Sequence, residues 1–216
     1  MASESKLFDP EGLLMTSFDT VKNLIILNLL TIICSLPIVT AGAAFTALHY
    51  SVLKMVRNEE GYISKNFFKS FKENLKQGIG FSVIMLLAGA FIGAAFYATL
   101  MFEEDPGFVK LARVLLVVMA VAYILQLTFF FPVQAKLAAT LSQNMSNAFK
   151  MALSHFPMTL LMIVLNALPF VICYFFNFLI PVLLIFGFSL PAIWDAKLYD
   201  KIFKKLEDDL NAREDI

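Results

Sequence analysis

Residues 78–102 read GIGFSVIMLLAGAFIGAAFYATLMF, a run without one Asp, Glu, Lys or Arg. A helix that spans a membrane needs about 20 consecutive apolar residues, with a range of about 17–25. The run is therefore long enough for one complete span. A soluble helix keeps a polar face toward water, whereas a bilayer accepts a helix that is apolar all round. The stretch predicts an integral membrane protein.

The rest of the chain has the same character. Of its 216 residues 59% are hydrophobic and 16% are charged, against about 45–50% and about 25% in soluble domains. We therefore expect an all-α fold, a polytopic membrane helical bundle that forms a single membrane domain over residues 1–216. Five main spanning segments are expected, at 24–53, 78–102, 109–131, 157–176 and 178–194.

The first segment, 24–53, follows an N-terminal arm at 1–23 and is interrupted by Pro37 and Gly42. It is too long for one straight span and short for two. Proline removes a backbone donor and kinks or ends a helix. Two interpretations stay open: one kinked helix that crosses once, or a short helix that crosses and a second helix that returns, which adds a sixth crossing.

The orientation follows from Lys and Arg, which concentrate on the cytoplasmic side of short loops. Most of them fall in three places, which are residues 54–76, residues 136–150 and the tail at 195–216. We expect these places, and so the C-terminus, on the cytoplasmic side of the cell membrane. The turns at 103–107 and Asn177 then lie outside. The N-terminus lies outside if the first segment crosses once and inside if it crosses twice.

A weak internal repeat suggests how the segments are grouped. Residues 70–77 align with 148–155, and each stretch follows an apolar segment that contains a proline, Pro37 or Pro132. A real duplication would give two repeated helical hairpins plus one helix, although so short a match also arises by chance.

The region 54–77 is expected to form a cytoplasmic amphipathic helix. Its apolar positions fall on one side at helical spacing, and its lysines line the other. The apolar side comprises Phe67, Phe68, Phe71 and Leu75, and the basic side includes Lys69 and Lys72. Such a helix either rests on the inner leaflet or docks into a groove of a protein partner. Phe149 and Lys150 repeat the Phe-Lys pair before a later span and form a second candidate surface.

Small and polar residues inside the spans indicate helix packing. Gly89 and Gly93 form a small-xxx-small pair, which lets helices approach closely within the bundle or in a homo-oligomer. Asn28 and Asn166 are expected to make hydrogen bonds between helices. No Asp, Glu, Lys or Arg lies in the middle of the last four segments, which argues against an ion-coupled transporter.

Motifs of catalysis are missing. The chain has no HExxH, CxxC, phosphate-binding loop or GxSxG, and its two histidines, His49 and His155, cannot build a metal site alone. We expect no enzyme, no cofactor, no metal and no nucleic-acid partner, and the lipid bilayer is the partner that the composition itself predicts.

Two blocks of the sequence resemble the YesL family of bacterial membrane proteins. The first block runs from Asn28 to Leu48 and contains LPIVTAGAA at 36–44, and the second is FFKSFKEN at 67–74. Phe131-Pro132-Val133 and Asn147-Ala148 resemble later landmarks of the family. The resemblance implies association with carbohydrate ABC importers, through permease or ATPase subunits, and it carries over no site residues. We expect a non-enzymatic accessory membrane protein of such an importer or of its sensing system. The alternative is a small permease or channel-like transporter acting on its own.

Overall fold

The computed structural model describes the backbone of residues 10–59, 61–102 and 106–214, and side chains within 18–59, 61–102 and 106–208. Every regular element in these ranges is a helix. The elements are α1 (Pro10–Ser35), η2 (Ile38–Thr40), α2 (Ala41–Val56), α3 (Ile63–Leu100), α4 (Gly107–Lys136), α5 (Leu141–Ser154), α6 (Phe156–Phe175), η3 (Asn177–Leu179), α7 (Ile180–Phe186) and α8 (Ser189–Glu214). Four of them, α1, α3, α4 and α6, are long and apolar enough to cross a membrane, and the bent pair α7–α8 raises this to five. The prediction of an all-α polytopic bundle is confirmed.

The first apolar segment forms two helices that are separated at Pro37. The Thr40 hydroxyl lies 2.7 Å from the Cys34 carbonyl and 2.8 Å from that of Pro37, so it donates to groups that the break exposes. Beyond the break α2 turns back along α1, and residues 61–64 come to lie beside residues 22–26 in the middle of α1. The segment is therefore a helical hairpin rather than one kinked helix.

This hairpin changes the predicted boundaries. Helix α1 begins at Pro10, inside the arm predicted at 1–23, of which residues 1–9 lie outside the described part. Helix α2 has 16 residues, or about 24 Å at 1.5 Å per residue. Because a hydrocarbon core is about 30 Å thick, α2 is too short to provide the sixth full crossing by itself.

The amphipathic stretch predicted at 54–77 is not a helix of its own. Residues 63–77 are the first turns of α3, which continues without a break to Leu100 over 38 residues. At 1.5 Å per residue α3 is about 57 Å long, almost twice the thickness of a hydrocarbon core. Its basic first turns therefore extend out of the bilayer as a continuation of the span.

Local sequence explains where the later helices begin and bend. Helix α5 starts with a capping box, in which the Thr140 amide donates to Gln143 Oε1 at 3.0 Å and the Gln143 amide donates to Thr140 Oγ1 at 3.4 Å. The span predicted at 178–194 is broken: α7 and the start of α8 meet at 54°. The tail predicted at 195–216 is mostly the continuation of α8, with residues 215–216 outside the described part.

The repeat predicted from 70–77 and 148–155 has no structural counterpart. The first stretch lies inside the continuous α3, whereas the second contains the end of α5 and the turn at His155 before α6.

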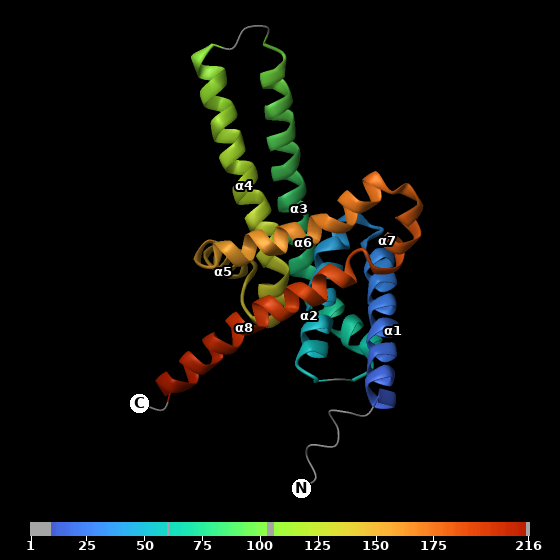
Figure 1. The fold of residues 1–216 in the computed structure, drawn as a ribbon. Coiled ribbons are helices and arrows are strands. Elements are labelled where there is room, and N and C mark those ends of the chain that lie inside the picture. The colour runs from blue at the N-terminus through green and yellow to red at the C-terminus, as the bar shows by residue number, and fades with distance from the viewer. Residues whose placement is uncertain (1–9, 60, 103–105, 215–216) are drawn as a thin grey trace.

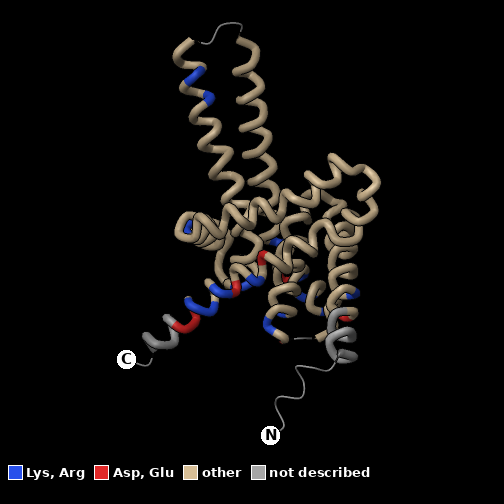
Figure 2. The backbone as a smooth tube through the Cα atoms, in the orientation of Figure 1, with Lys and Arg blue, Asp and Glu red and all other residues tan. Residues whose placement is uncertain are grey.

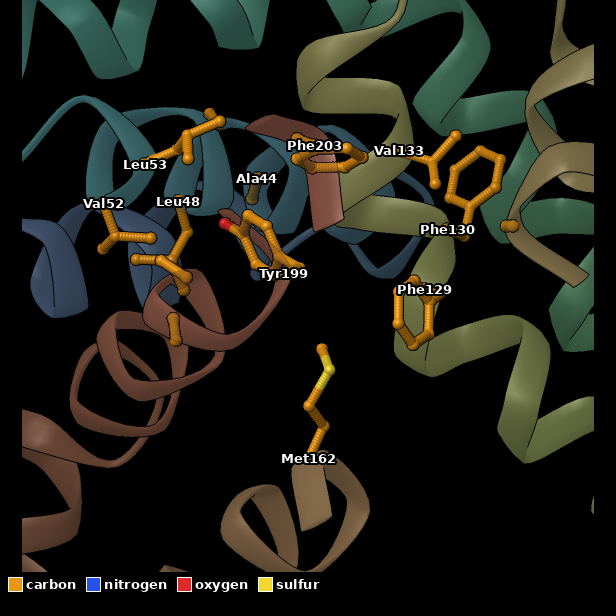
Figure 3. Packing of buried hydrophobic residues seen from close by; sticks show 14 of the residues in the cluster. Ala44, Leu48, Val52, Leu53, Phe129, Phe130, Val133, Met162, Tyr199 and Phe203 are labelled. Atoms are coloured by element: carbon orange, nitrogen blue, oxygen red, sulfur yellow. The ribbon is translucent and has the colours of Figure 1, made fainter. Parts of the chain in front are cut away.

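Helix α2 lies at the centre of the fold. One hydrophobic cluster joins it to α3, α4, α6 and α8. Figure 3 labels members of this cluster from α2, α4, α6 and α8, among them Leu48, Phe129, Met162, Tyr199 and Phe203. Contact between α2 and α3 is closest at Gly42 and Gly78, where an added Cβ on either residue would overlap backbone atoms of the other helix. The two glycines thus let these helices touch.

Helices α3 and α4 continue away from this centre as a long hairpin (Figure 1). Large apolar side chains cover its outer part and are exposed; they include Leu87, Phe91, Leu111, Val114 and Val118. Near its tip Arg113 Nη2 donates to the Thr99 carbonyl at 2.8 Å and joins the two helices. Figure 2 shows most Lys and Arg of the described residues around the opposite end of the molecule and along α8.

Candidate functional site

A cavity of about 380 Å³ lies between α2, α3, α4, α6 and α8. Four aromatic side chains line it: Phe45 of α2, Phe81 of α3, and Tyr123 and Phe131 of α4. The Phe131 ring lies 5.4 Å from the Phe45 ring and 5.6 Å from the Phe81 ring, measured between centroids. These rings form a continuous wall.

The cavity also contains a buried acid, Asp195 of α8, which is 1% exposed. Its Oδ2 accepts a hydrogen bond of 2.5 Å from Asn166 Nδ2 of α6. Its Oδ1 is buried and has no hydrogen-bond partner. Because a buried polar atom without a partner costs free energy, this half of the carboxyl group is the part of the site that is ready for a ligand.

His49 and Tyr199 lie next to the acid. The Tyr199 hydroxyl is 3.4 Å from His49 Nδ1 and donates to the His49 carbonyl at 3.2 Å. Tyr199 follows Asp195 by one helical turn, so both reach the same face of α8. The pair is buried and fixes α8 against α2 on this side of the cavity.

Ser82 positions the wall formed by α3. Its hydroxyl oxygen accepts a 2.8 Å hydrogen bond from the Gly42 amide, one turn beyond the contact between Gly42 and Gly78. Ile38, Leu86 and Asn166 line the cavity and are themselves exposed, so they mark its open side.

Sequence reasoning missed this site. Asp195 follows directly after the segment predicted at 178–194 and falls in the tail predicted at 195–216. His49 was considered only as one of two histidines that cannot build a metal site alone. The available signal was local: Asp195 follows the apolar Ile193 and Trp194, and Tyr199 stands one turn beyond. Residues from α2, α6 and α8 meet only in the folded chain.

The structure corrects the predicted surface on residues 67–75. Phe67 is fully buried, and its ring stacks on Phe71 at 6.2 Å between centroids. Phe71 packs partly buried against the core, and Leu75 is half-buried. Phe67 and Phe71 of this stripe face the protein because α3 packs against α2 on that side. Phe67 therefore serves neither as a lipid anchor nor as a docking residue.

Other predicted surface residues remain accessible. Phe68, Lys69 and Lys72 are exposed on the outer side of α3. Phe149 and Lys150 are exposed on α5, whose Ala148 and Ala152 face the core. The structure does not bring the α3 and α5 surfaces into one site.

The predicted packing residues have different surroundings. Asn28 is buried: its Nδ2 donates to the Leu184 carbonyl at 2.7 Å, and its Oδ1 accepts from the amides of Phe188 and Ser189 at 2.8 and 3.1 Å. It thereby satisfies backbone groups at the bend between α7 and α8. Asn166 joins α6 to α8 through Asp195.

The glycine pair on α3 is split between two environments. A Cβ on Gly89 would meet the Tyr123 hydroxyl at 3.0 Å, whereas a Cβ on Gly93 would meet nothing within 4 Å. Only the Gly89 end of the pair therefore packs against another helix of the described chain.

A network of ion pairs joins three helices at the end of the core where Lys and Arg concentrate. Arg57 Nε pairs with Asp200 Oδ1 at 2.6 Å and its Nη1 with Glu207 Oε1 at 3.3 Å, and Lys136 Nζ lies 2.5 Å from the same Glu207 oxygen. Partial burial disfavours the charge on Arg57, but its two acidic partners outweigh this and raise its pKa above the ordinary value. The network holds α2, α4 and α8 together.

Within the ranges that the structure describes, no three His, Cys, Asp or Glu side chains stand close enough to hold a metal ion. The cavity can instead bind a small organic molecule, because it combines an apolar wall with a few polar groups at fixed positions.

Fold and site together define a multi-pass, all-helical membrane protein with a small cavity that is open on one side. Residues 24–96, which contain most of α1, all of α2 and most of α3, match the family described as "Protein of unknown function, DUF624". No curated protein and no solved structure matches the chain.

Proposed function

We propose that this chain is a non-enzymatic accessory protein of the plasma membrane that works with a carbohydrate ABC importer or its sensing system. The observation that carries the proposal is the outer α3–α4 hairpin. Its large apolar side chains are exposed, and Gly93 has open space above it. Small residues let a neighbouring helix approach closely, so this surface suits lateral packing on the helices of a permease subunit.

The resemblance adds the biological context. The matched family is the one typically called YesL, and the residues that carry the likeness, from Asn28 to Leu48 and from Phe67 to Asn74, lie within 24–96. These residues build the α1–α2–α3 unit. The implied link to carbohydrate importers belongs to the resemblance and is proposed here for this chain.

The same proposal includes an orientation. The basic ends of α2, α3 and α8 face the cytoplasm, in line with the positive-inside rule, and the tip of the α3–α4 hairpin lies outside. Because residues 22–26 of α1 lie beside residues 61–64, the N-terminus belongs on the cytoplasmic side together with the C-terminus.

Affinity purification from native membranes tests the accessory role. We expect permease or ATPase subunits to accompany the tagged chain, and we expect the double variant Gly93→Leu, Ala94→Leu to lose them while it still inserts. The matched control, Val164→Leu with Val171→Leu, adds bulk to exposed apolar positions of another span, α6, and should keep the subunits. Recovery of no transport subunit from cells grown on several carbohydrates would contradict the proposal.

A second candidate function is transport by the chain itself, and the buried Asp195 favours it. Ionisable residues are rare inside membrane-spanning segments, and those that occur often lie on substrate or ion pathways. Flux of radiolabelled sugars or amines into liposomes that contain only the purified chain would support transport. Absence of flux together with recovery of permease subunits favours the accessory role.

A further inference from the structure

We propose that the cavity beside Asp195 is a binding site for an ammonium group, either a free organic amine or the amine headgroup of a lipid. This inference goes beyond the proposed accessory role and does not depend on it. It starts from the charge of the lining: Asp195 is the one acidic residue in it, and no Lys or Arg lines this cavity. An ionised Asp195 carboxylate is therefore balanced best by a cationic ligand.

The geometry around the acid leaves one of its two carboxyl oxygens open to a ligand. Asn166 already occupies Oδ2 at 2.5 Å, whereas Oδ1 is buried without a partner. The Arg57 guanidinium is engaged with Asp200 and Glu207. The free oxygen is therefore open to a positively charged group of a ligand from outside the described chain.

The aromatic wall favours an organic cation over a metal ion. Phe45, Phe81, Tyr123 and Phe131 line the same cavity as the acid, and aromatic faces attract ammonium groups at distances up to about 6 Å. A metal ion would need several oxygen or nitrogen ligands, and no three His, Cys, Asp or Glu side chains of the described residues stand close enough to hold one. One carboxylate in an aromatic surround is the combination by which quaternary and primary amines are recognised.

Size and access agree with this class of ligand. A cavity of about 380 Å³ is at the small end of the range of about 300–1,000 Å³ for small-molecule sites. Its open side is bordered by the exposed apolar residues Ile38 and Leu86. An amine that carries an apolar body, or a lipid whose acyl chains stay in the bilayer, can enter by this side with its cationic end first.

The test uses a matched pair of probes on the purified full-length chain in detergent. Choline carries the ammonium group, and 3,3-dimethyl-1-butanol has the same shape without the charge. Saturation-transfer NMR titrations give the affinity of each. We expect choline to bind at least tenfold more tightly than the alcohol. Equal affinities, or no binding of choline, would overturn the proposal.

Variants locate the site. Asp195→Asn keeps the shape of the side chain and removes its charge, so the preference for choline should disappear. Asp208→Asn removes the same charge from an exposed position on the same helix and should leave the preference intact. A folded Asp195→Asn protein that still prefers choline would overturn the assignment. If that variant does not fold, Phe131→Leu serves instead, and the affinity for choline should fall by about three- to tenfold, since each cation–π contact has a modest strength.

A final arm separates the two sources of the ammonium group. Native mass spectrometry of the chain extracted from membranes should detect a retained phosphatidylethanolamine, displaced by choline, if a lipid headgroup is the natural occupant. A free amine is indicated if no lipid is retained and choline still binds directly. Either result supports the ammonium site. If no lipid is retained and choline does not bind, this inference is overturned. Recovery of permease subunits in the same preparation would then leave the accessory role standing.

Discussion

Helix α3 belongs to two regions of different character. From Ile63 to Met85 it is part of the core, where Phe67 and Phe81 are fully buried and Gly78 touches α2. Beyond Leu86 it is part of the outer hairpin, where Leu87 and Phe91 are mostly exposed. Apolar residues are frequent in both parts. The difference teaches that hydrophobicity places this chain in a membrane, whereas small and polar residues at contact points decide which surfaces meet protein and which meet lipid.

The largest contrast is expected between two phenylalanines of the same helix. Phe81→Ala removes a ring that is 1% exposed and stacks on Phe130 at 3.4 Å, and it should cost about 3–5 kcal/mol of unfolding free energy. Phe91→Ala, at a position that is 62% exposed, should change it by less than about 0.5 kcal/mol. Unfolding in mixed detergent micelles measures both. Equal losses would show that the hairpin packs on protein in the purified state.

Glycine variants sharpen the same comparison. Gly78→Ala places a methyl group against the α2 backbone at Ala43, and since a backbone cannot move aside like a side chain, we expect a loss of about 3 kcal/mol, the upper end of typical overpacking. Gly93→Ala meets nothing within 4 Å and should be neutral or stabilising by up to about 1 kcal/mol through helix propensity. A destabilised Gly93→Ala protein that remains monomeric would contradict the assignment of Gly93 to an open surface.

A smaller effect is expected at the bend between α7 and α8. Asn28→Ala removes three hydrogen bonds to backbone groups of Leu184, Phe188 and Ser189. Side-chain hydrogen bonds in membrane proteins contribute about 0.6 kcal/mol each on average, so the loss should be about 2 kcal/mol. Asn23→Ala, on the same helix and without a side-chain hydrogen bond in the described structure, is the control and should have little effect. The interpretation fails if both variants are equally stable.

The last prediction concerns which side of the membrane each end of the molecule occupies. No change in stability is expected from it. In a background without Cys34 and Cys173, single cysteines at Lys69 and Lys204 should be protected from an impermeant maleimide in intact cells, because the proposed orientation puts the basic end in the cytoplasm. A cysteine at Lys110, near the hairpin tip, should react. Reaction at Lys69 or Lys204 from outside would reverse the proposed orientation.

The corrections share one physical cause. An apolar stripe at helical spacing shows that one side of a helix avoids water, but it does not say what covers that side. On residues 63–77 the cover is α2, so Phe67 is a core residue. The basic side was identified correctly as exposed, because Lys69 and Lys72 extend away from the core. The sequence analysis also missed that residues 63–77 and the following span form one continuous helix. No residue between 63 and 77 indicates whether the helix breaks there.

The sequence by itself determined the class of protein, the approximate positions of the long spans and the break at Pro37, because apolar length and proline act locally along the chain. Only the tertiary structure decided that α2 returns as a buried central helix, that Gly42 and Gly78 meet, and that Asp195, Asn166 and the aromatic wall enclose one cavity. These features depend on contacts between residues far apart in the chain, and the hydropathy of a single segment carries no information about its partner.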